Sequence, residues 1–471
     1  MQYQFNPTVL REYDIRGIIG ETLGAEDARA IGRGFGTLLR EAGGKTVAVG
    51  YDGRVSSPML EHALIEGITA SGCDVVRIGL SATPMLYYAE ASSEQVDGGI
   101  QITGSHNPPN YNGFKMVFLG RPFFGADIQK LGKLAADGAF ATGAGEVTSR
   151  DVMGEYVERL LKGLAGIEPG KLEALRVGWD AGNGSAGPAL EALAARLPGE
   201  HHLLFTEVDG HFPNHHPDPT VEANLADLRA LVAAKNLDFG VAFDGDGDRI
   251  GAIDGEGRII WGDQLLMIYA EDVLKTRKGA TVIADVKASR ALFDRVSELG
   301  GVPLMWKTGH SLIKSKMKET AAPLAGEMSG HVFFADDYYG FDDALYAGIR
   351  LIAASARLGR SVTELRGAMA PMHNTPEMRF QVDESRKFAA MEEIAGRLTA
   401  NPGPEVESVN TTDGVRVNTA DGWWLLRASN TQDVLVARAE SESEDGLERL
   451  LAQIDAQLAA SGLERSESVG H

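Results

Sequence analysis

One pattern recurs three times along this chain and restricts the folds that it can adopt. Each copy is a short apolar run that ends in aspartate, followed by small or polar residues and then by a helical pattern. The apolar runs are residues 46–52, 176–180 and 281–285, and the helical patterns are residues 57–70, 185–197 and 289–299. A strand, a polar loop and a helix in this order are typical of sheets that contain parallel strands. The pattern therefore predicts three α/β domains with mixed or parallel sheets, related by ancestry or by convergence, whose ligand loops follow the carboxyl ends of strands.

The pattern changes after about residue 369. The apolar runs 378–382, 414–417, 423–426 and 434–438 indicate strands, and residues 385–399 and 445–459 have helical patterns. This mixture predicts a smaller α+β domain. A chain of 471 residues is too long for one core. We therefore expect three related α/β domains, a smaller C-terminal α+β domain and an active site in the central cleft, with boundaries at 1–150, 151–256, 257–369 and 370–471.

One serine is presented on a tight loop at the end of a predicted strand. Residues 98–101 indicate a buried strand, and Ser105 follows them among small and polar residues. Two prolines at 108–109 prevent the chain from re-entering a helix or a β-ladder. With Lys115 nearby, this layout indicates covalent chemistry on a hydroxyl, although an ordinary polar loop has a similar composition. His106 is expected to be a poor base for Ser105, because adjacent side chains of an extended segment point to opposite faces.

A second apolar run, residues 239–243, leads directly into three aspartates at alternate positions, Asp244, Asp246 and Asp248. The glycines between them let the backbone fold sharply, so that the three carboxylates converge. Such a group needs a counter-charge, and a hard cation bound through oxygens, Mg²⁺ above all, supplies it. An EF-hand loop is excluded, since its sixth and twelfth positions, counted from Asp244, hold arginine and glycine instead of glycine and glutamate. A solvated acidic turn is the other interpretation of this segment.

Two further segments carry groups that suit a phosphorylated sugar. Residues 326–331 place a carboxylate, a hydroxyl and an imidazole between glycines, and such groups hydrogen-bond sugar hydroxyls. Residues 427–433 follow a predicted strand and combine an arginine with hydroxyls, an amide and backbone N–H groups, which together form an oxyanion cradle. Each segment alone is also compatible with an ordinary turn.

Together, and in this order, the four segments strongly resemble those of the α-D-phosphohexomutase superfamily, with the bacterial phosphomannomutase/phosphoglucomutase group as the best match. Residues 13–17, Tyr-Asp-Ile-Arg-Gly, also resemble the opening motif of that family. The resemblance covers nearly the whole chain. It implies that Ser105 is phosphorylated in the active enzyme, and that Asp244, Asp246 and Asp248 bind Mg²⁺ together with a phosphoserine oxygen.

The implied reaction is a reversible phosphoryl transfer between the 1- and 6-positions of hexose phosphates, with mannose and glucose as the sugars. Phosphoserine donates to the substrate, the resulting 1,6-bisphosphosugar turns end for end, and its other phosphate returns to serine. Glucose 1,6-bisphosphate, or the mannose equivalent, is therefore the expected activator and intermediate. The expected catalytic residues are Ser105, Lys115, Arg16, His331 and Arg249, and the expected substrate-binding residues are Tyr13, Lys287, His310, Glu327, Ser329, Arg427, Ser429, Asn430 and Thr431.

Phosphoryl transfer depends mainly on positioning and on electrostatic stabilisation. Lys115 and His331 are both candidates for the group that carries the proton, and their residue types alone do not rank them. Arg16 and Arg249 are expected to contribute charge and positioning. The resemblance places the substrate's distal phosphate on residues 427–431, and we expect the small last domain to swing and close over the substrate.

Charge and cysteine content narrow the possible partners. The chain has 45 basic and 66 acidic residues, a net charge of −21, which argues against binding to nucleic acid or to an anionic membrane. Because a phosphosugar is itself anionic, its site must be a local positive island. The single cysteine, Cys73, excludes an intramolecular disulfide, and no signal peptide or long apolar run is evident. We expect a cytoplasmic monomer or weak dimer whose partners are hexose phosphates.

Three alternative functions are open at this point. A phosphoglucosamine mutase of the same superfamily typically has glutamine where this chain has Met328. A phosphatase that uses Asp244 as nucleophile would have threonine or valine two residues after Asp246, where this chain has Asp248. A binding protein on the same fold would not need every motif residue that chemistry demands, yet all of them are present.

Overall fold

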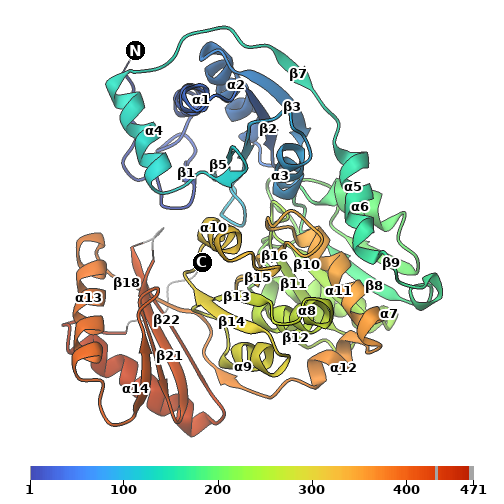
Figure 1. Ribbon diagram of the computed structural model, residues 1–471, viewed down its shortest axis with the longest axis vertical. Coiled ribbons are helices and arrows are strands. Elements are labelled where there is room, and N and C mark those ends of the chain that lie inside the picture. The colour runs from blue at the N-terminus through green and yellow to red at the C-terminus, as the bar shows by residue number, and fades with distance from the viewer. Residues whose placement is uncertain (1, 430–432, 466–471) are drawn as a thin grey trace.

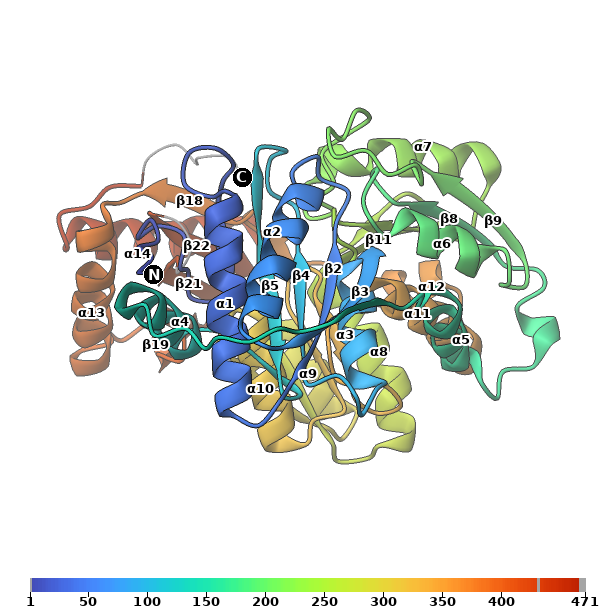
Figure 2. The same ribbon diagram turned by 90° about the horizontal axis from the view of Figure 1, so that it is seen from above.

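In residues 2–429 and 433–465, which the computed structural model describes, the chain forms four β-sheets with helices packed against them (Figure 1). The first sheet has the order β1-β5-β4-β2-β3-β7, with β6 beside β5. Its strands are β1 (Ile15–Ile18), β2 (Thr46–Tyr51), β3 (Asp74–Leu80), β4 (Gly98–Ile102), β5 (Tyr111–Phe118), β6 (Arg121–Pro122) and β7 (Val147–Ser149). The helices are α1 (Ala25–Glu41), α2 (Ser57–Ala70), α3 (Thr83–Ala91) and α4 (Ala126–Asp137). Helices α1 and α2 pack closely against each other, as Figure 2 shows.

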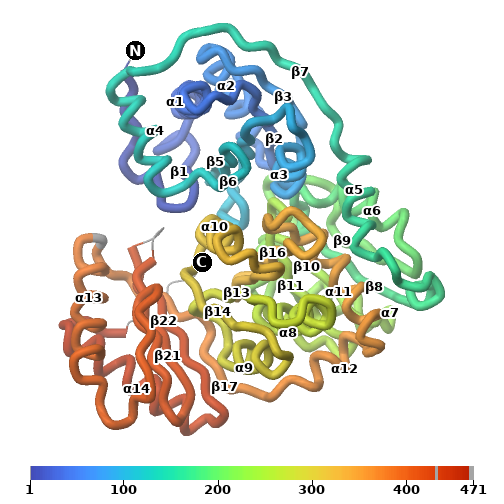
Figure 3. Tube along the Cα trace, viewed as in Figure 1, coloured from blue at the N-terminus to red at the C-terminus, as the bar shows by residue number. Residues whose placement is uncertain are grey.

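The second sheet follows after a long extended segment that runs from α4 through β7 to α5 (Figure 3). Its order is β12-β11-β10-β8-β9. The strands are β8 (Arg176–Asp180), β9 (Glu200–Leu204), β10 (Phe239–Phe243), β11 (Ile250–Asp254) and β12 (Ile259–Ile260). The helices are α5 (Met153–Leu161), α6 (Gly187–Ala194) and α7 (Ala226–Lys235), with short 3₁₀ turns at Lys162–Leu164, Pro169–Lys171 and Glu222–Leu225.

The third sheet has the order β14-β13-β15-β16. Its strands are β13 (Thr281–Asp285), β14 (Val302–Trp306), β15 (Leu324–Gly326) and β16 (Val332–Phe334). The helices are α8 (Gly262–Thr276), α9 (Arg290–Glu298), α10 (His310–Thr320), α11 (Ala344–Leu358) and α12 (Val362–Gly367).

The first three sheets share one strand order. In each, a central strand has a parallel neighbour on either side, and the later of these neighbours pairs with an antiparallel strand that follows it. The shared orders are β3-β2-β4-β5, β9-β8-β10-β11 and β14-β13-β15-β16. Strands β4, β10 and β15 are buried along their whole length, which explains why their sequences do not alternate between apolar and polar residues. The prediction of three related α/β domains with mixed sheets is confirmed.

The fourth sheet contains only antiparallel pairs. Its order is β17-β22-β21-β20-β19, with β18 beside β22. The strands are β17 (His373–Asn374), β18 (Met378–Gln381), β19 (Val406–Asn410), β20 (Val415–Thr419), β21 (Gly422–Ala428) and β22 (Val434–Ser441), and the helices are α13 (Glu384–Ala400) and α14 (Glu444–Ala459). This part of the chain is the predicted α+β domain. The domain boundaries at 150, 256 and 369 stay predictions.

The hydrophobic cores divide the molecule unequally. One continuous cluster joins residues of the first three domains, from Ala48 on β2 to Leu365 on α12. The fourth domain has its own cluster, from Phe380 to Leu458. A small cluster of Val286, Trp423 and Leu425 connects it to the third domain. The first domain also has a cluster of its own, from Phe5 to Ala135, but the shared cluster joins this domain to the second and third. The fourth domain, in contrast, is attached by a small apolar contact and by polar contacts.

None of the helices in the described parts of the chain combines the length and the hydrophobicity needed to cross a bilayer.

Candidate active site

The loops predicted to carry the chemistry are the same connection in three domains. Residues 103–110 join β4 to β5, residues 244–249 join β10 to β11, and residues 327–331 join β15 to β16. Each connection leaves the carboxyl end of a strand beside the central strand, where ligand loops of such sheets gather. The three connections contact one another, because Ser105 bonds to Asp244 and Arg249 bonds to His331. Repetition of one architecture thus brings three equivalent loops to one place.

A cleft of about 1020 Å³ lies at this place and is lined by residues of all four domains. The predicted site residues that line it are Tyr13, Arg16, Ser105, Lys115, Arg249, Lys287, His310, Glu327, Ser329, His331, Arg427 and Ser429. The three aspartates of the metal-binding prediction are fully buried next to it. The predicted residues Asn430 and Thr431 lie outside the described residues.

Ser105 has an unusual backbone conformation in a buried position. Its φ is 50°, in the left-handed region that residues other than glycine rarely adopt. Its N–H donates to Thr103 Oγ1 at 2.8 Å, and its hydroxyl donates to Asp244 Oδ2 at 2.9 Å. The ring of His106 also lies close, with Nδ1 3.4 Å from Ser105 Oγ. The expectation that these neighbours point to opposite faces is wrong, because the segment is not extended at Ser105.

Arg54, which the sequence analysis did not identify, holds the loop around Ser105 in place through hydrogen bonds to its backbone. Its guanidinium is fully buried and donates to the carbonyl oxygens of four loop residues at 2.6 to 3.0 Å; these are Ser105, Asn107, Pro108 and Tyr111. Asp52 accepts from Arg54 Nε and from the N–H of Gly104, which ties the same loop to the end of β2. These contacts offset the strain at Ser105. The signal in the sequence was the Asp-Gly-Arg triplet that directly follows the first repeated strand.

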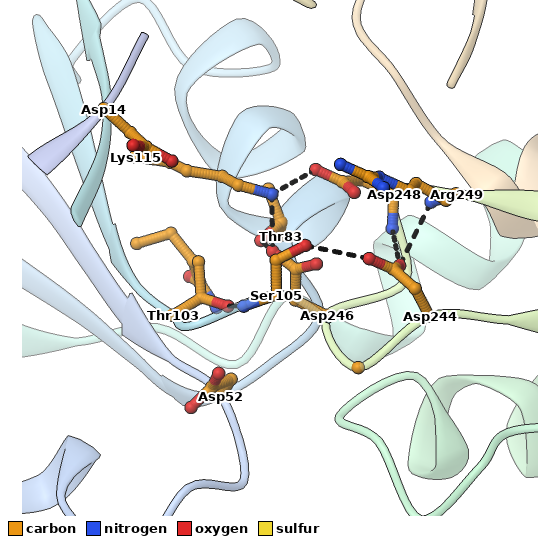
Figure 4. Close-up of polar contacts among 12 residues, drawn as sticks. Asp14, Asp52, Thr83, Thr103, Ser105, Lys115, Asp244, Asp246, Asp248 and Arg249 are labelled. Carbon is orange, nitrogen blue, oxygen red and sulfur yellow. Dashed lines mark hydrogen bonds and ion pairs between the residues drawn. The ribbon is translucent and has the colours of Figure 1, made fainter. Parts of the chain in front are cut away.

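The carboxylates of Asp244, Asp246 and Asp248 converge around Lys115, which comes from β5 of the first domain (Figure 4). Lys115 Nζ donates to Asp246 Oδ2 at 2.7 Å and also to Asp248 Oδ2. Thr83, at the start of α3, donates its hydroxyl to the same oxygen of Asp246 at 2.5 Å. The first domain therefore supplies the hydroxyl, the ammonium and the serine that meet the aspartates of the second.

Burial and mutual repulsion dominate the electrostatics of this group. Burial raises the pKa of the Asp244 carboxyl well above its usual range, and Asp246 and Asp248 raise it further. Burial opposes the charge of Asp246 too, but Lys115 outweighs it and holds the pKa of Asp246 below its ordinary value. Burial would lower the pKa of Lys115, yet Asp246 and Asp248 hold that pKa above its ordinary value. Lys115 is therefore a protonated cation in this arrangement.

The three aspartates fit a divalent cation. One ligand oxygen from each lies within 4.8 Å of the others. Asp246 Oδ1 and Asp248 Oδ1 are buried and have no hydrogen-bond partner among the described residues, and one lysine cannot balance three carboxylates. Oxygen-only ligands, a high charge density and orphaned lone pairs are the chemistry that Mg²⁺ or a similar hard cation satisfies.

His331 links the loop of residues 244–249 to its own loop, residues 327–331. Its Nε2 accepts a hydrogen bond from Arg249 Nε at 3.0 Å, so its proton lies on Nδ1, which is 3.0 Å from Asp342 Oδ2. Lys314 Nζ is 2.9 Å from the other oxygen of Asp342. Ligand atoms of Asp248, His331 and Asp342 also lie within 4.8 Å of one another, and Lys115 and Lys314 pair with the two carboxylates of this group. His331 therefore orients Arg249 through one hydrogen bond and lies next to the Asp342 carboxylate on its other side.

Hydrogen bonds fix the loop of residues 327–331 and the neighbouring residues 308–309. Glu327 Oε1 accepts from the Gly309 N–H at 2.6 Å, and Asp285, the aspartate of the third repeat, accepts from the Met328 N–H at 3.2 Å. Tyr13 of the first domain donates to the carbonyl oxygen of Thr308 at 2.9 Å. A side chain at residue 309 would collide with the Tyr13 ring, 2.8 Å from a Cβ, so this close approach requires the glycine found there. Ser329 and His310 complete this side of the cleft.

At the far end of the cleft, cations are already paired with carboxylates. Arg427 Nε donates to Asp413 Oδ2 at 3.0 Å. Lys287 Nζ donates to Glu377 Oε2 at 3.0 Å, and Arg379 donates to Glu377 Oε1 at 2.7 and 2.9 Å. The sequence analysis identified Lys287 and Arg427 but missed Arg379 and both carboxylates, because charged residues scattered over two domains carry no local motif. Arg16 lies at the other end, between Asp14 and Asn107.

Comparisons with known proteins agree with this geometry. Four domain models of phosphoglucomutase/phosphomannomutase match the chain: α/β/α domain I at residues 7–141, domain II at 154–257, domain III at 261–372 and the C-terminal domain at 377–457. The phosphomannomutase/phosphoglucomutase of Pseudomonas aeruginosa is 45% identical over 453 residues, 96% of each chain. A phosphoglucomutase of Neisseria meningitidis is 42% identical over 95% of this chain and 96% of its own. A crystal structure of a family protein from Burkholderia thailandensis is 44% identical, with a TM-score of 0.90 over 99% of this chain and 100% of its own.

Proposed function

Because the chain belongs to the phosphoglucomutase/phosphomannomutase family, we propose that Ser105 is the residue that carries the phosphoryl group in its reaction. The protein is a hexose phosphate mutase, an isomerase that transfers a phosphoryl group between the 1- and 6-positions. This excludes the phosphatase and the binding protein as alternatives. The mannose or glucose preference, and the exclusion of amino sugars that Met328 suggests, are matters for assay.

The assignment of Ser105 rests on the position of its hydroxyl, whose oxygen lies 2.9 Å from Asp244 Oδ2. The hydroxyl is part of a strained loop that Arg54 holds in place. In the transfer, the bond between the phosphorus and Ser105 Oγ breaks while a bond to a sugar hydroxyl forms. The sugar hydroxyl loses a proton, and Ser105 Oγ regains one. In the reverse half-reaction the same atoms exchange roles.

Lys115 places its ammonium group on Asp246 and Asp248, so we propose that it neutralises charge on the transferred group. Lys115 and His331 are both proposed as candidates for the group that carries the proton. Arg249 neutralises the opposite side, and His331 positions it through the hydrogen bond between their side chains. Arg16, held by Asp14 and Asn107, faces the cleft from the serine side and contributes positive charge to an otherwise acidic protein.

Asp244, Asp246 and Asp248, with a phosphoryl oxygen on Ser105, would hold the metal ion that we propose to be Mg²⁺. When bound, the ion neutralises these carboxylates and withdraws charge from the phosphoryl group. With the ion bound, Asp246 and Asp248 would interact with both the ion and Lys115. This chain's own part is to keep three buried carboxylates together and next to Ser105.

The rest of the cleft would bind the sugar and the phosphate that does not react. Glu327 and Ser329 suit hydroxyls common to both orientations of the sugar, with Lys287, His310 and Tyr13 beside them. Arg427 and Ser429 are proposed to hold the distal phosphate, together with Asn430 and Thr431. One cradle can serve both half-reactions if a 1,6-bisphosphosugar turns between them, so we propose glucose 1,6-bisphosphate or the mannose equivalent as activator and intermediate.

An assay on glucose 1-phosphate and mannose 1-phosphate with one preparation tests the function and ranks the two sugars. Adding glucosamine 1-phosphate tests the third alternative. Phosphopeptide mapping after incubation with glucose 1,6-bisphosphate tests Ser105, and a stable phosphate found on another residue would overturn its assignment.

We also propose that the enzyme works in the cytoplasm as a monomer or weak dimer, without nucleic-acid or membrane partners. The net charge of −21 supports the absence of polyanionic partners. Sedimentation analysis checks the oligomeric state.

A further inference from the structure

The contact between the third and fourth domains has two parts of different character. One part consists of buried hydrogen bonds from the fourth domain to the loop that follows β13. Arg416 donates to the carbonyl oxygens of Val286 and Ala288, both at 2.7 Å, and Glu440 accepts from the Ser289 hydroxyl at 2.8 Å. These groups do not line the cleft. They form the attachment about which the fourth domain is held.

The other part faces the cleft and consists of ion pairs. Glu377, just before β18 of the fourth domain, accepts from Lys287 of the third domain and from Arg379 of its own domain. Asp413 accepts from Arg427 of its own domain and from the Thr308 N–H of the third. Each carboxylate therefore links the two domains and is also paired with cationic side chains that line the cleft.

Glu377 is the stronger bridge. Its side chain is 11% exposed, and that of Lys287 is 8% exposed, so water screens this pair weakly. Burial opposes the charge of Glu377, but Lys287 and Arg379 outweigh it and hold the pKa of this carboxyl well below its usual range. Glu377 is thus ionised at any pH at which the enzyme works. An oxyanion that enters this end of the cleft meets Lys287 and Arg379 with a carboxylate already bound to both.

From this geometry we propose that Glu377 is an internal competitor for the substrate's phosphate and a latch between the third and fourth domains. In the absence of ligand its carboxylate neutralises Lys287 and Arg379 and ties the domains together. A phosphate dianion takes over these cations and frees Glu377, so that the bound ligand replaces Glu377 as the link that holds the fourth domain against the third. The inference rests on the proposed placement of the distal phosphate beside Arg427.

The latch makes substrate binding weaker than the cations alone would allow. Apparent affinity falls by the fraction of molecules whose site is free to bind. Replacing Glu377 by glutamine keeps the shape and removes the charge that competes. Glu377→Gln should therefore bind glucose 6-phosphate more tightly, by about threefold to tenfold, and bind inorganic phosphate more tightly by a similar factor. The same variant should loosen the ligand-free domain contact.

Calorimetric titration of the full-length, unphosphorylated enzyme with each ligand, in chelator to prevent turnover, measures the affinities. The matched control is Glu393→Gln, which removes the same charge from an exposed ion pair with Arg386 on the same domain and should leave both affinities unchanged. Thermolysin cleavage near residues 368–372 measures the contact: Glu377→Gln should be cleaved faster than wild type without ligand and protected by glucose 6-phosphate.

The outcomes separate this proposal from the one on which it rests. Unchanged affinity in Glu377→Gln overturns the latch, and so does an equal gain in Glu393→Gln, which would be an effect of net charge. Weaker binding combined with faster cleavage would mean that Glu377 only positions Lys287, and would overturn competition. If Arg427→Ala also binds glucose 6-phosphate as well as wild type, the distal cradle itself is misplaced. If Arg427→Ala is weak while Glu377→Gln is unchanged, the cradle stands and the latch alone fails.

Discussion

The two ends of the cleft are built in opposite ways. At the serine end, residues from two domains converge on the same few atoms: Thr83 and Lys115 of the first domain both donate to Asp246 Oδ2 of the second, and Ser105 donates to Asp244. One apolar cluster runs through the first three domains, and the first domain has a second cluster of its own. At the far end, the fourth domain has its own core and meets the cleft through ion pairs.

The difference matches what each end must do. Phosphoryl transfer requires reacting groups to be held within a fraction of an ångström, and a continuous core with buried hydrogen bonds provides that rigidity. In the proposed mechanism, the far end must admit a sugar phosphate, release an intermediate to turn and bind it again. Ion pairs can be exchanged for a phosphate without opening a core, so a separately packed domain suits this task. The comparison predicts that changes at the serine end affect the chemical step, whereas changes at the far end affect binding.

The largest effect is expected from Ser105→Ala. Removing the hydroxyl removes the group to which we propose that the phosphoryl is attached, so turnover should fall about 10³-fold or more. The fold should persist, because Arg54 bonds to backbone oxygens of the loop rather than to this side chain. Turnover assays and thermal melts check both expectations, with the exposed Ser149→Ala as control. A variant that retains substantial activity would move the phosphoryl group elsewhere.

The next effect concerns the metal ion. Three buried carboxylates with orphaned oxygens need a cation, so exhaustive chelation should reduce turnover to background and Mg²⁺ should restore it. Asp246→Asn should raise the Mg²⁺ concentration needed for half-maximal activity by about tenfold or more. Equilibrium Mg²⁺ binding to the resting enzyme provides a readout apart from turnover. Full activity after chelation would rule the site out.

A smaller effect is expected at the other end. Arg427→Ala removes a charged contact worth roughly 1.5–3 kcal/mol, so the Michaelis constant should rise about tenfold or more while Mg²⁺ binding is unaffected. More bisphosphate intermediate should also escape into solution. The exposed Arg449→Ala, paired with Asp421 on the same domain, is the control. Should Arg427→Ala instead lower kcat with an unchanged Michaelis constant, the contrast between the two ends breaks down.

The predicted swing of the fourth domain gives a related test of the same contrast. Cleavage by thermolysin near residue 369 should change when glucose 6-phosphate is added to the wild-type enzyme, because the domain closes over its ligand. Cleavage in the first three domains should not change. Identical patterns with and without ligand would show that all four domains form one rigid body.

The smallest effect concerns the stability of the three-domain body. Asp343 caps α11 and accepts from the hydroxyls of Tyr156 and Tyr338. Burial raises its pKa from 3.8 to about 6 although these donors oppose the shift. The folded state therefore holds this proton more tightly than the unfolded state, so the contribution of Asp343 to stability is greatest below about pH 4 and is lost as the pH rises through about 6.

Asp343→Asn should remove this pH dependence. Between about pH 5 and pH 7.5, the free energy of unfolding of the variant should rise relative to wild type by about 1 kcal/mol. Urea unfolding at the two pH values measures the change, and Asp137→Asn, in an exposed pair with Lys133, should show none. A difference that does not vary with pH would mean that the carboxyl is ionised throughout.

Much of the fold and of the chemistry was predictable because it is local in sequence. The recurrent strand, aspartate, loop and helix predicted three mixed sheets, and α2 begins and ends where its pattern does, at Ser57 and Ala70. Motif residues such as Ser105 and Asp246 follow strands directly, so their position at strand ends could be inferred. The orientation of His106 could not, because it depends on a left-handed φ at Ser105. Arg54, which follows β2, and Thr103, in the same loop as Ser105, stabilise that conformation.

The sequence by itself determined which groups this protein has and on which loops they lie, since strands, turns and helices depend on neighbours along the chain. Only the tertiary structure decided which charges meet. Lys115 lies between Asp246 and Asp248, Arg54 binds four carbonyl groups, and Glu377 pairs with Lys287. These contacts join residues that are 51 to 133 positions apart in the sequence. Coulomb energies depend on distance in space and on burial, and neither quantity is written in the order of the residues.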